Sequence, residues 1–191
     1  MRTTFGQFIE YCRYQRNLSE LTCAAYNSDF GLFREWILGR KDRITIDRIE
    51  PADIQAYIIH LRKSGSQQNT VLRKLNALSS FFDYCIKWHG LKVNPVKYCE
   101  RGKKIKHKAM VPPQEMVDRV FTLVDLQEGP FHEVSQDRVV LMLFVTAGLR
   151  FSEVLLLTWE RINFVEREII VLGKGNKERK VPMLVNLYNA L

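Results

Sequence analysis

T-A-G-L-R-F-S-E-V-L-L-L-T-W, residues Thr146 to Trp159, combines a helix end, a tight turn and a helix start within one short segment. We call it the first box. Gly148 is predicted to cap the preceding helix, and Ser152 is predicted to be the N-cap of the next one. Arg150 then lies just before a helix N-terminus, where its guanidinium and the free backbone N–H groups can hold a phosphate together. For Arg150 the alternative is an ordinary surface arginine in a loop. For Glu153 the helix dipole alone is a sufficient explanation, because it favours an acidic residue in the first turn.

Downstream of the first box the hydrophobic period changes from that of a helix to two, which predicts three short strands over residues 161–164, 166–172 and 179–183. The last two are joined by Gly-Lys-Gly-Asn-Lys, residues 173–177, which is typical of a tight turn. Lys174 is predicted at the tip of this hairpin, where a lysine can reach into a groove. An ordinary solvated turn is the alternative, and neither a dinucleotide-binding nor a P-loop motif fits the segment.

The residues before this region have helical periodicity throughout. Four amphipathic helices are predicted in the first 98 residues, and these predict a compact bundle. A further helix is predicted from Pro113 to about Leu126. The apolar run Val139–Val145 fits a buried strand or a buried helix by its periodicity, and its Leu and Met content favours a helix. The predicted helices of the bundle cover approximately residues 5–12, 19–39, 51–64 and 71–86.

The positive charge is concentrated in the first 112 residues of the sequence. The chain of 191 residues has a net charge of +8, with 15 basic and 9 acidic residues before position 99, 5 and 1 over 99–112, and 9 and 11 over 113–191. The basic segment over 99–112 ends at paired prolines and is a candidate linker. We therefore predict a helical domain over 1–98, a basic linker over 99–112 and a second domain over 113–191. The linker is either a solvated charge run or a strap across a phosphate backbone.

Several classes of protein are excluded by the composition. It is 46% apolar and 26% charged, as in ordinary globular chains, and its longest purely apolar run, Val139–Val145, is far too short to span a membrane. The polar N-terminus does not fit a signal peptide, so a cytoplasmic location is expected. Four cysteines without a C-x-x-C pair indicate reduced thiols, and no metal site or cofactor is expected.

Together, the first box and G-K-G-N-K-E-R-K-V-P over Gly173–Pro182, which we call the second box, resemble the first half of a tyrosine recombinase (phage integrase) catalytic domain. The preceding helices resemble the SAM-like core-binding domain of that family. The resemblance implies a mainly α protein with a four-helix SAM-like domain, followed by an α+β catalytic portion with a small three-stranded antiparallel sheet. It also implies that the partner is double-stranded DNA and that no metal is needed.

The resemblance assigns roles to individual residues. Arg150 matches the catalytic arginine that contacts the non-bridging oxygens of the scissile phosphate, and Lys174 matches the general acid for the departing 5′-oxygen. Glu153 matches an acidic position that supports the site without reacting. Lys177 and Arg179 of the second box are expected to contact DNA.

The family pattern continues with an H-x-x-R box and a tyrosine that forms a 3′-phosphotyrosyl link. Neither is found between Lys174 and residue 191. Tyr188 precedes the position where the box should come, and it is predicted to be a core aromatic on a helix beginning near Val185.

The expected function is that of a site-specific recombinase in a shortened chain, which binds DNA but is inactive alone. The alternative is a non-catalytic protein that occupies recombination sites or pairs with full-length recombinase protomers. A third hypothesis is a basic helical protein that has no role in nucleic-acid binding.

Further DNA contacts are predicted in the basic half of the chain. Arg73 and Lys74 flank the apolar stripe of the fourth helix, where they face either a DNA groove or solvent. Lys103, Lys104 and Lys106 of the linker are expected to meet phosphates, which gives affinity without sequence selectivity.

Overall fold

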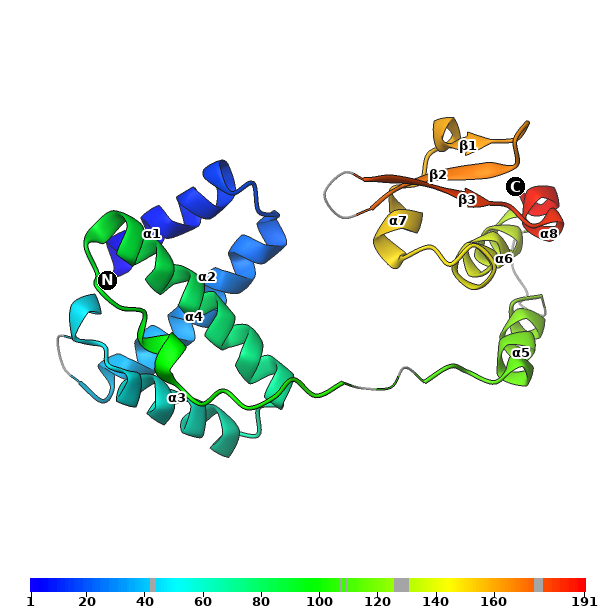
Figure 1. The fold of residues 1–191 in the computed structure, drawn as a ribbon. Coiled ribbons are helices and arrows are strands. Elements are labelled where there is room, and N and C mark those ends of the chain that lie inside the picture. Colours follow the sequence, from blue (N-terminus) through cyan, green and yellow to red (C-terminus); the bar gives the residue numbers. More distant parts are fainter. Residues whose placement is uncertain (42–43, 107, 109, 126–130, 174–176) are drawn as a thin grey trace. The chain divides into compact units, whose positions relative to one another are not determined.

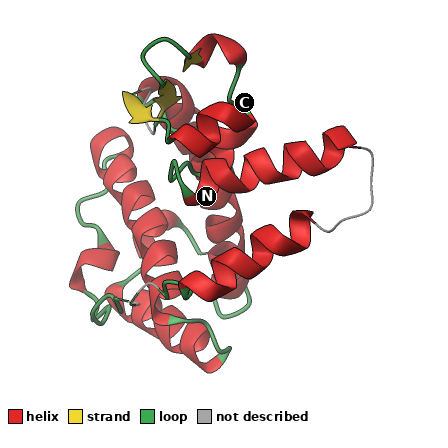
Figure 2. Ribbon diagram, turned by 90° about the vertical axis from the view of Figure 1, so that its right-hand side faces the viewer, coloured by secondary structure: helices red, strands yellow, loops and turns green. Residues whose placement is uncertain are grey.

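The computed structural model describes residues 1–41, 44–106, 108, 110–125, 131–173 and 177–191. The chain forms two compact units, Met1–Lys108 and Ala109–Leu191 (Figure 1). The mainly helical fold class predicted from the sequence is confirmed, and Figure 2 shows that helices make up most of the structure. None of the helices in the described part of the chain is long and apolar enough to cross a membrane.

The first unit is a bundle of four long helices. They are α1 (Arg2–Glu10), α2 (Glu20–Leu38), α3 (Pro51–Lys63) and α4 (Gln68–His89), and a π-helical turn η1 (Tyr11–Gln15) extends α1. Short 3₁₀ turns η2 (Ile46–Arg48) and η3 (Pro95–Tyr98) follow α2 and α4.

Local sequence sets the ends of these helices. The hydroxyl of Ser19 accepts a hydrogen bond from the backbone of Thr22 and caps α2, as predicted. Pro51 occupies the first turn of α3, and Gly90 ends α4 with φ +69°, a conformation that glycine adopts without strain.

The core of this unit is strongly aromatic. Phe8 of α1, Phe33 of α2, Tyr57 of α3 and Phe82 of α4 are almost fully buried, so all four helices contribute to one core. Burial of each such side chain is worth about 1.5–3 kcal/mol, which makes the packing of the amphipathic faces the main source of stability here.

The second unit carries the sheet. Its helices are α5 (Gln114–Asp125), α6 (Phe131–Val145), α7 (Phe151–Leu155) and α8 (Val185–Ala190), with a 3₁₀ turn η4 (Trp159–Arg161). The strands β1 (Ile162–Asn163), β2 (Glu168–Leu172) and β3 (Glu178–Pro182) are antiparallel, with β2 in the centre (Figure 1). The second core joins Met142 and Leu143 of α6, Ile169 and Val171 of β2, and Leu187 of α8.

Two details of the second unit were predicted correctly. Val139–Val145 belongs to helix α6 and not to a strand. Tyr188 lies on α8, which begins at Val185 as predicted, and the partly buried ring packs against the second core and edge-on to Phe164.

The predicted N-cap of the helix in the first box was wrong. Arg150, not Ser152, is the N-cap of α7, because the Glu153 carboxylate folds back onto the backbone N–H of Arg150 and fixes the helix start two residues earlier. The helix is short, since it ends at Leu155, and Trp159 at the end of the first box begins a 3₁₀ turn.

Candidate functional site

A carboxylate between two arginines forms the centre of the candidate site. Glu153, in the first turn of α7, accepts a hydrogen bond at 2.7 Å from the backbone N–H of Arg150 and one at 2.8 Å from Nη1 of the same residue. Arg179 of β3 donates from Nη1 to Oε1 at 2.7 Å and from Nη2 to Oε2 at 2.8 Å. Four hydrogen bonds thus converge on one carboxylate, and the two from Arg179 join the second box to the first.

The local backbone explains how these groups meet. Gly148 has φ +62°, which turns the chain sharply after α6 and leaves Arg150 extended at the N-cap. In the hairpin, Val171 of β2 pairs with Arg179 of β3. The β2–β3 register therefore sets the place from which the Arg179 guanidinium reaches α7.

Glu153 is held as a carboxylate. Its side chain is only 4% exposed, yet hydrogen bonds from Arg179 and from the backbone of Arg150 outweigh this burial and hold the pKa of Glu153 well below its usual range. The same contact raises the pKa of Arg179 above its ordinary value. The Glu153 position therefore stays negatively charged, which suits a fixed support and not a group that exchanges protons.

Arg150 is the more exposed of the two arginines. Its side chain is 72% exposed, against 37% for that of Arg179. A guanidinium has five N–H donors in a fixed fork, and the bond to Glu153 uses one from Nη1. The two guanidinium groups and one carboxylate carry a net charge of +1, so the remaining donors of Arg150 can bind an anion such as a phosphate.

Lys174, the predicted general acid, lies outside the described residues. The hairpin on either side of it is closed, because Leu172 pairs with Glu178 and the N–H of Gly173 donates to the carbonyl of Lys177 at 2.7 Å. Lys177 is exposed, as a DNA contact requires. Arg179, in contrast, is bound to Glu153 and is 37% exposed, and its contact with DNA stays a prediction.

In the first unit, the predicted pair Arg73 and Lys74 meets a buried acid. Asp29 of α2, whose side chain is 1% exposed, receives hydrogen bonds from both terminal nitrogens of Arg73 and from Nζ of Lys74 at 3.1 Å. The Lys74 side chain is only 10% exposed, so the expectation that it faces a groove or solvent was wrong. Arg73 is half-exposed, and its contact with DNA stays a prediction.

The basic linker residues behave as expected in one respect, because Lys103, Lys104 and Lys106 are all exposed. Among the residues that the structure describes, no group of three or more His, Cys, Asp or Glu side chains is arranged to hold a metal ion.

Sequence reasoning missed two acid–base contacts. Neither the pairing of Arg179 with Glu153 nor the position of Asp29 under Arg73 and Lys74 was predicted. The capping-box spacing, with an acidic residue three positions after the N-cap, signals the bond of Glu153 to the backbone of Arg150 but not its pairing with Arg179. For Asp29 the signal was its position on the apolar face of the second predicted helix, four residues after Ala25 and four before Phe33, where a carboxylate needs a partner.

Two protein-family models match the sequence, one within each unit. The model "Phage integrase, N-terminal SAM-like domain" matches residues 5–89, and "Phage integrase family" matches residues 117–191. Tyrosine recombinase XerC of Thermodesulfovibrio yellowstonii is 32% identical over 92% of this chain and 56% of its own length. XerC of Herpetosiphon aurantiacus is 27% identical over 100% of this chain and 61% of its own length. The chain thus spans little more than half the length of these relatives.

Solved structures show the same fold. A lambda integrase dimer bound to a COC′ core site matches 95% of this chain and 48% of its own with a TM-score of 0.71 at 16% identity. XerH site-specific recombinase bound to palindromic difH substrate matches 97% of this chain over 55% of its own length, with a TM-score of 0.68 and 18% identity. Two matching family models, which together cover most of the sequence, show that the chain belongs to the phage integrase family of tyrosine recombinases.

Proposed function

We propose that residues 1–191 bind duplex DNA and supply the phosphate-binding arginine of a tyrosine recombinase site, without completing strand cleavage themselves. The observation that carries this proposal is the exposed Arg150 guanidinium, which donates a hydrogen bond to the Glu153 carboxylate. Arg179 in turn holds that carboxylate in place. Donors that are already oriented lower the cost of stabilising charge on a phosphate oxygen in the transition state.

In the proposed site, Arg150 donates to the non-bridging oxygens of the scissile phosphate. Lys174 protonates the departing 5′-oxygen, because a lysine at a hairpin tip can approach a strand end with little movement of the backbone. Glu153 touches neither the phosphate nor the leaving group, and it acts by fixing Arg150. The activity that these groups serve is cleavage and rejoining of DNA strands through a 3′-phosphotyrosyl link, which also needs a tyrosine nucleophile.

Tyr188 does not fit the part of that nucleophile. It is the only tyrosine after Lys174, and its ring is partly buried against the second core with the Arg167 guanidinium over it at 4.9 Å. We therefore expect no covalent adduct when residues 1–191 are incubated with a nicked suicide substrate. An adduct that disappears in Tyr188→Phe would contradict this assignment.

DNA contact by Arg150 can be tested at one phosphate. A bound duplex is first selected from a random pool, and each phosphate near its centre is then replaced in turn by a neutral methylphosphonate. At one position the methylphosphonate should lower the affinity of the wild-type chain about tenfold. The affinity of Arg150→Ala should be the same with and without the methylphosphonate at that position. Arg119→Ala removes the same charge from an exposed position of α5 and should respond as the wild type does. Equal losses in all three proteins at every position would contradict the proposed role.

A second candidate function is that of a non-catalytic protein that occupies recombination sites or pairs with full-length recombinase protomers. The partly buried position of Tyr188 against the second core favours it. A short chain of this kind should inhibit strand exchange by a full-length recombinase on the same DNA site when added in excess. Exchange that continues unchanged while the site is occupied would argue against this candidate.

A further inference from the structure

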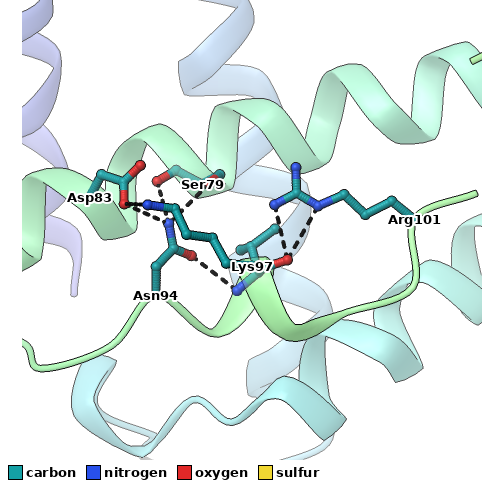
Figure 3. A network of polar contacts seen from close by, with 6 residues as sticks. Ser79, Asp83, Asn94, Lys97 and Arg101 are labelled. Atoms are coloured by element: carbon teal, nitrogen blue, oxygen red, sulfur yellow. Dashed lines mark hydrogen bonds and ion pairs between the residues drawn. The ribbon is translucent and has the colours of Figure 1, made fainter.

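The segment that follows α4 turns back and runs along that helix in the opposite direction. We call residues 94–106 the return segment. At its start, Nδ2 of Asn94 donates to the carbonyl and hydroxyl oxygens of Ser79 at 3.0 Å and to Oδ1 of Asp83 at 2.9 Å (Figure 3). Lys97 adds an ion pair to Asp83 at 2.7 Å. The segment is thereby anchored to the second half of α4.

Arg101 continues this attachment in the middle of the segment. Its Nε and Nη2 donate to the carbonyl of Val96 at 3.2 and 3.0 Å (Figure 3), and its Nη1 reaches Oδ1 of Asn76 at 3.4 Å. This arginine of the basic linker therefore serves the fold of the first unit, although its charge adds to the local potential.

Two amide side chains from the first turn of α4 hold the far end. Nε2 of Gln68 donates to the carbonyl of Arg101 at 2.7 Å. Nδ2 of Asn69 donates to the carbonyl of Ile105 at 2.9 Å, while its Oδ1 accepts from the N–H of Ile105 at 3.1 Å. Asn69 thus satisfies both backbone groups of one residue, much as a neighbouring strand would.

Gly102 fits closely between these contacts. It has φ +74°, and a Cβ at this position would lie 2.7 Å from Nε2 of Gln68 and 3.1 Å from Nη2 of Arg62. Any other residue here would be strained and would push the Gln68 amide away from the carbonyl of Arg101. The backbone is therefore fixed on both sides of Lys103 and Lys104.

We propose that Asn69 and Gln68 are positioning residues, which hold the return segment so that Lys103 and Lys104 meet consecutive phosphates of duplex DNA. This inference rests on the proposed DNA binding. Both lysines are exposed, while the backbone of Arg101, two residues before them, and that of Ile105, directly after them, are bound to α4. Ordering of the backbone before binding removes an entropic cost that a loose basic linker would incur on the DNA.

Asn69→Leu tests this role, with Asn27→Leu on an exposed position of α2 as the matched control. Duplex binding is measured over a series of salt concentrations. Each phosphate that is neutralised contributes about 0.9 to the slope of log affinity against log salt. We expect Asn69→Leu to reduce the steepness of that slope by about 2 and the control to leave it unchanged. A purely structural role would lower the melting temperature of Asn69→Leu without this change in slope.

The hydrogen bonds of Gln68 and Asn69 to the return segment are called the clamp. A double-variant cycle tests whether the two lysines depend on this clamp. Lys103→Ala/Lys104→Ala should also reduce the slope by about 2 in the wild-type background, since two phosphate contacts are lost. In the Asn69→Leu background the same pair of changes should have little further effect. Full additivity would overturn the proposal, because it would show that the lysines contact DNA without the clamp.

Gly102→Ala gives an independent route that leaves α4 intact, and it should have the same effect on the slope. Amide hydrogen exchange at Ile105 shows whether the clamp has opened, and protection should be lost in Asn69→Leu but kept in Asn27→Leu. An opened clamp with an unchanged slope would overturn the positioning role while the proposed function stands. If the wild-type chain itself shows no salt-dependent binding to duplex DNA, the proposed function fails instead.

Discussion

The Arg179 guanidinium and the Glu153 carboxylate face each other in parallel, with two hydrogen bonds of 2.7 and 2.8 Å between residues 26 positions apart in the sequence. This pairing ties the β2–β3 hairpin to the first turn of α7. Because the same carboxylate also binds the backbone and side chain of Arg150, the hairpin and Arg150 are coupled through one residue.

Replacement of Glu153 by glutamine should therefore weaken the second unit. The neutral amide keeps the shape of the side chain but cannot accept the paired hydrogen bonds of Arg179 and the additional ones of Arg150. We expect the melting temperature of a fragment containing residues 109–191, or of the corresponding transition in the whole chain, to fall by about 4–8 °C, as for a loss of about 1 kcal/mol in a domain of this size. Glu166→Gln, at an exposed position, is the control and should leave it unchanged.

The contribution of Glu153 should depend on pH in a defined direction. Its pKa in the folded protein is lowered from 4.5, chiefly by the hydrogen bond from Arg179. The stabilisation is therefore fully present above that value and is lost as the pH falls from 4.5 toward the lowered pKa. We expect the difference in melting temperature between the wild type and Glu153→Gln to be constant from pH 6 to pH 7 and to shrink below about pH 4.5. A difference that grew on acidification would contradict the assigned direction.

Asp29 should be among the most sensitive positions in the first unit. Asp29→Asn leaves the ammonium of Lys74 buried without a counter-ion, and the loss of one partner of a buried pair costs about 3–5 kcal/mol. Lys74→Met should cost less, because Arg73 still pairs with Asp29. Urea unfolding of both variants measures the two losses, and an equal or larger loss in Lys74→Met would contradict this ranking.

The four cysteines should differ in reactivity. Cys12, Cys23 and Cys85 are buried, and burial raises the pKa of Cys12 to about 11 and that of Cys85 to about 12, so few thiolates form there. Cys99 is only partly buried, although burial raises its pKa as well. With an aromatic disulfide reagent at pH 8, we expect one thiol to react slowly in the folded protein and all four to react in denaturant. Cys99→Ser should abolish the reaction of the folded protein.

Much of the fold follows from local patterns in the sequence. The apolar faces of the four helices, the N-cap at Ser19 and the change of period after the first box depend on residues within a few positions of one another. The helix over Val139–Val145 was decided by composition, since a run of seven apolar residues fits either structure by its period.

The sequence alone determined the helical first half, the sheet and the exposed linker lysines, because these depend on periodicity and charge, and it singled out Arg150 as a candidate site residue. Only the tertiary structure decided which partner each charge has. Arg179 lies on Glu153, Lys74 lies inside on Asp29, and Asn69 holds the backbone of Ile105 across 36 positions of sequence. The physical reason is that an ion pair or a hydrogen bond is set by distance in space, and packing of the cores brings together groups that no local pattern relates.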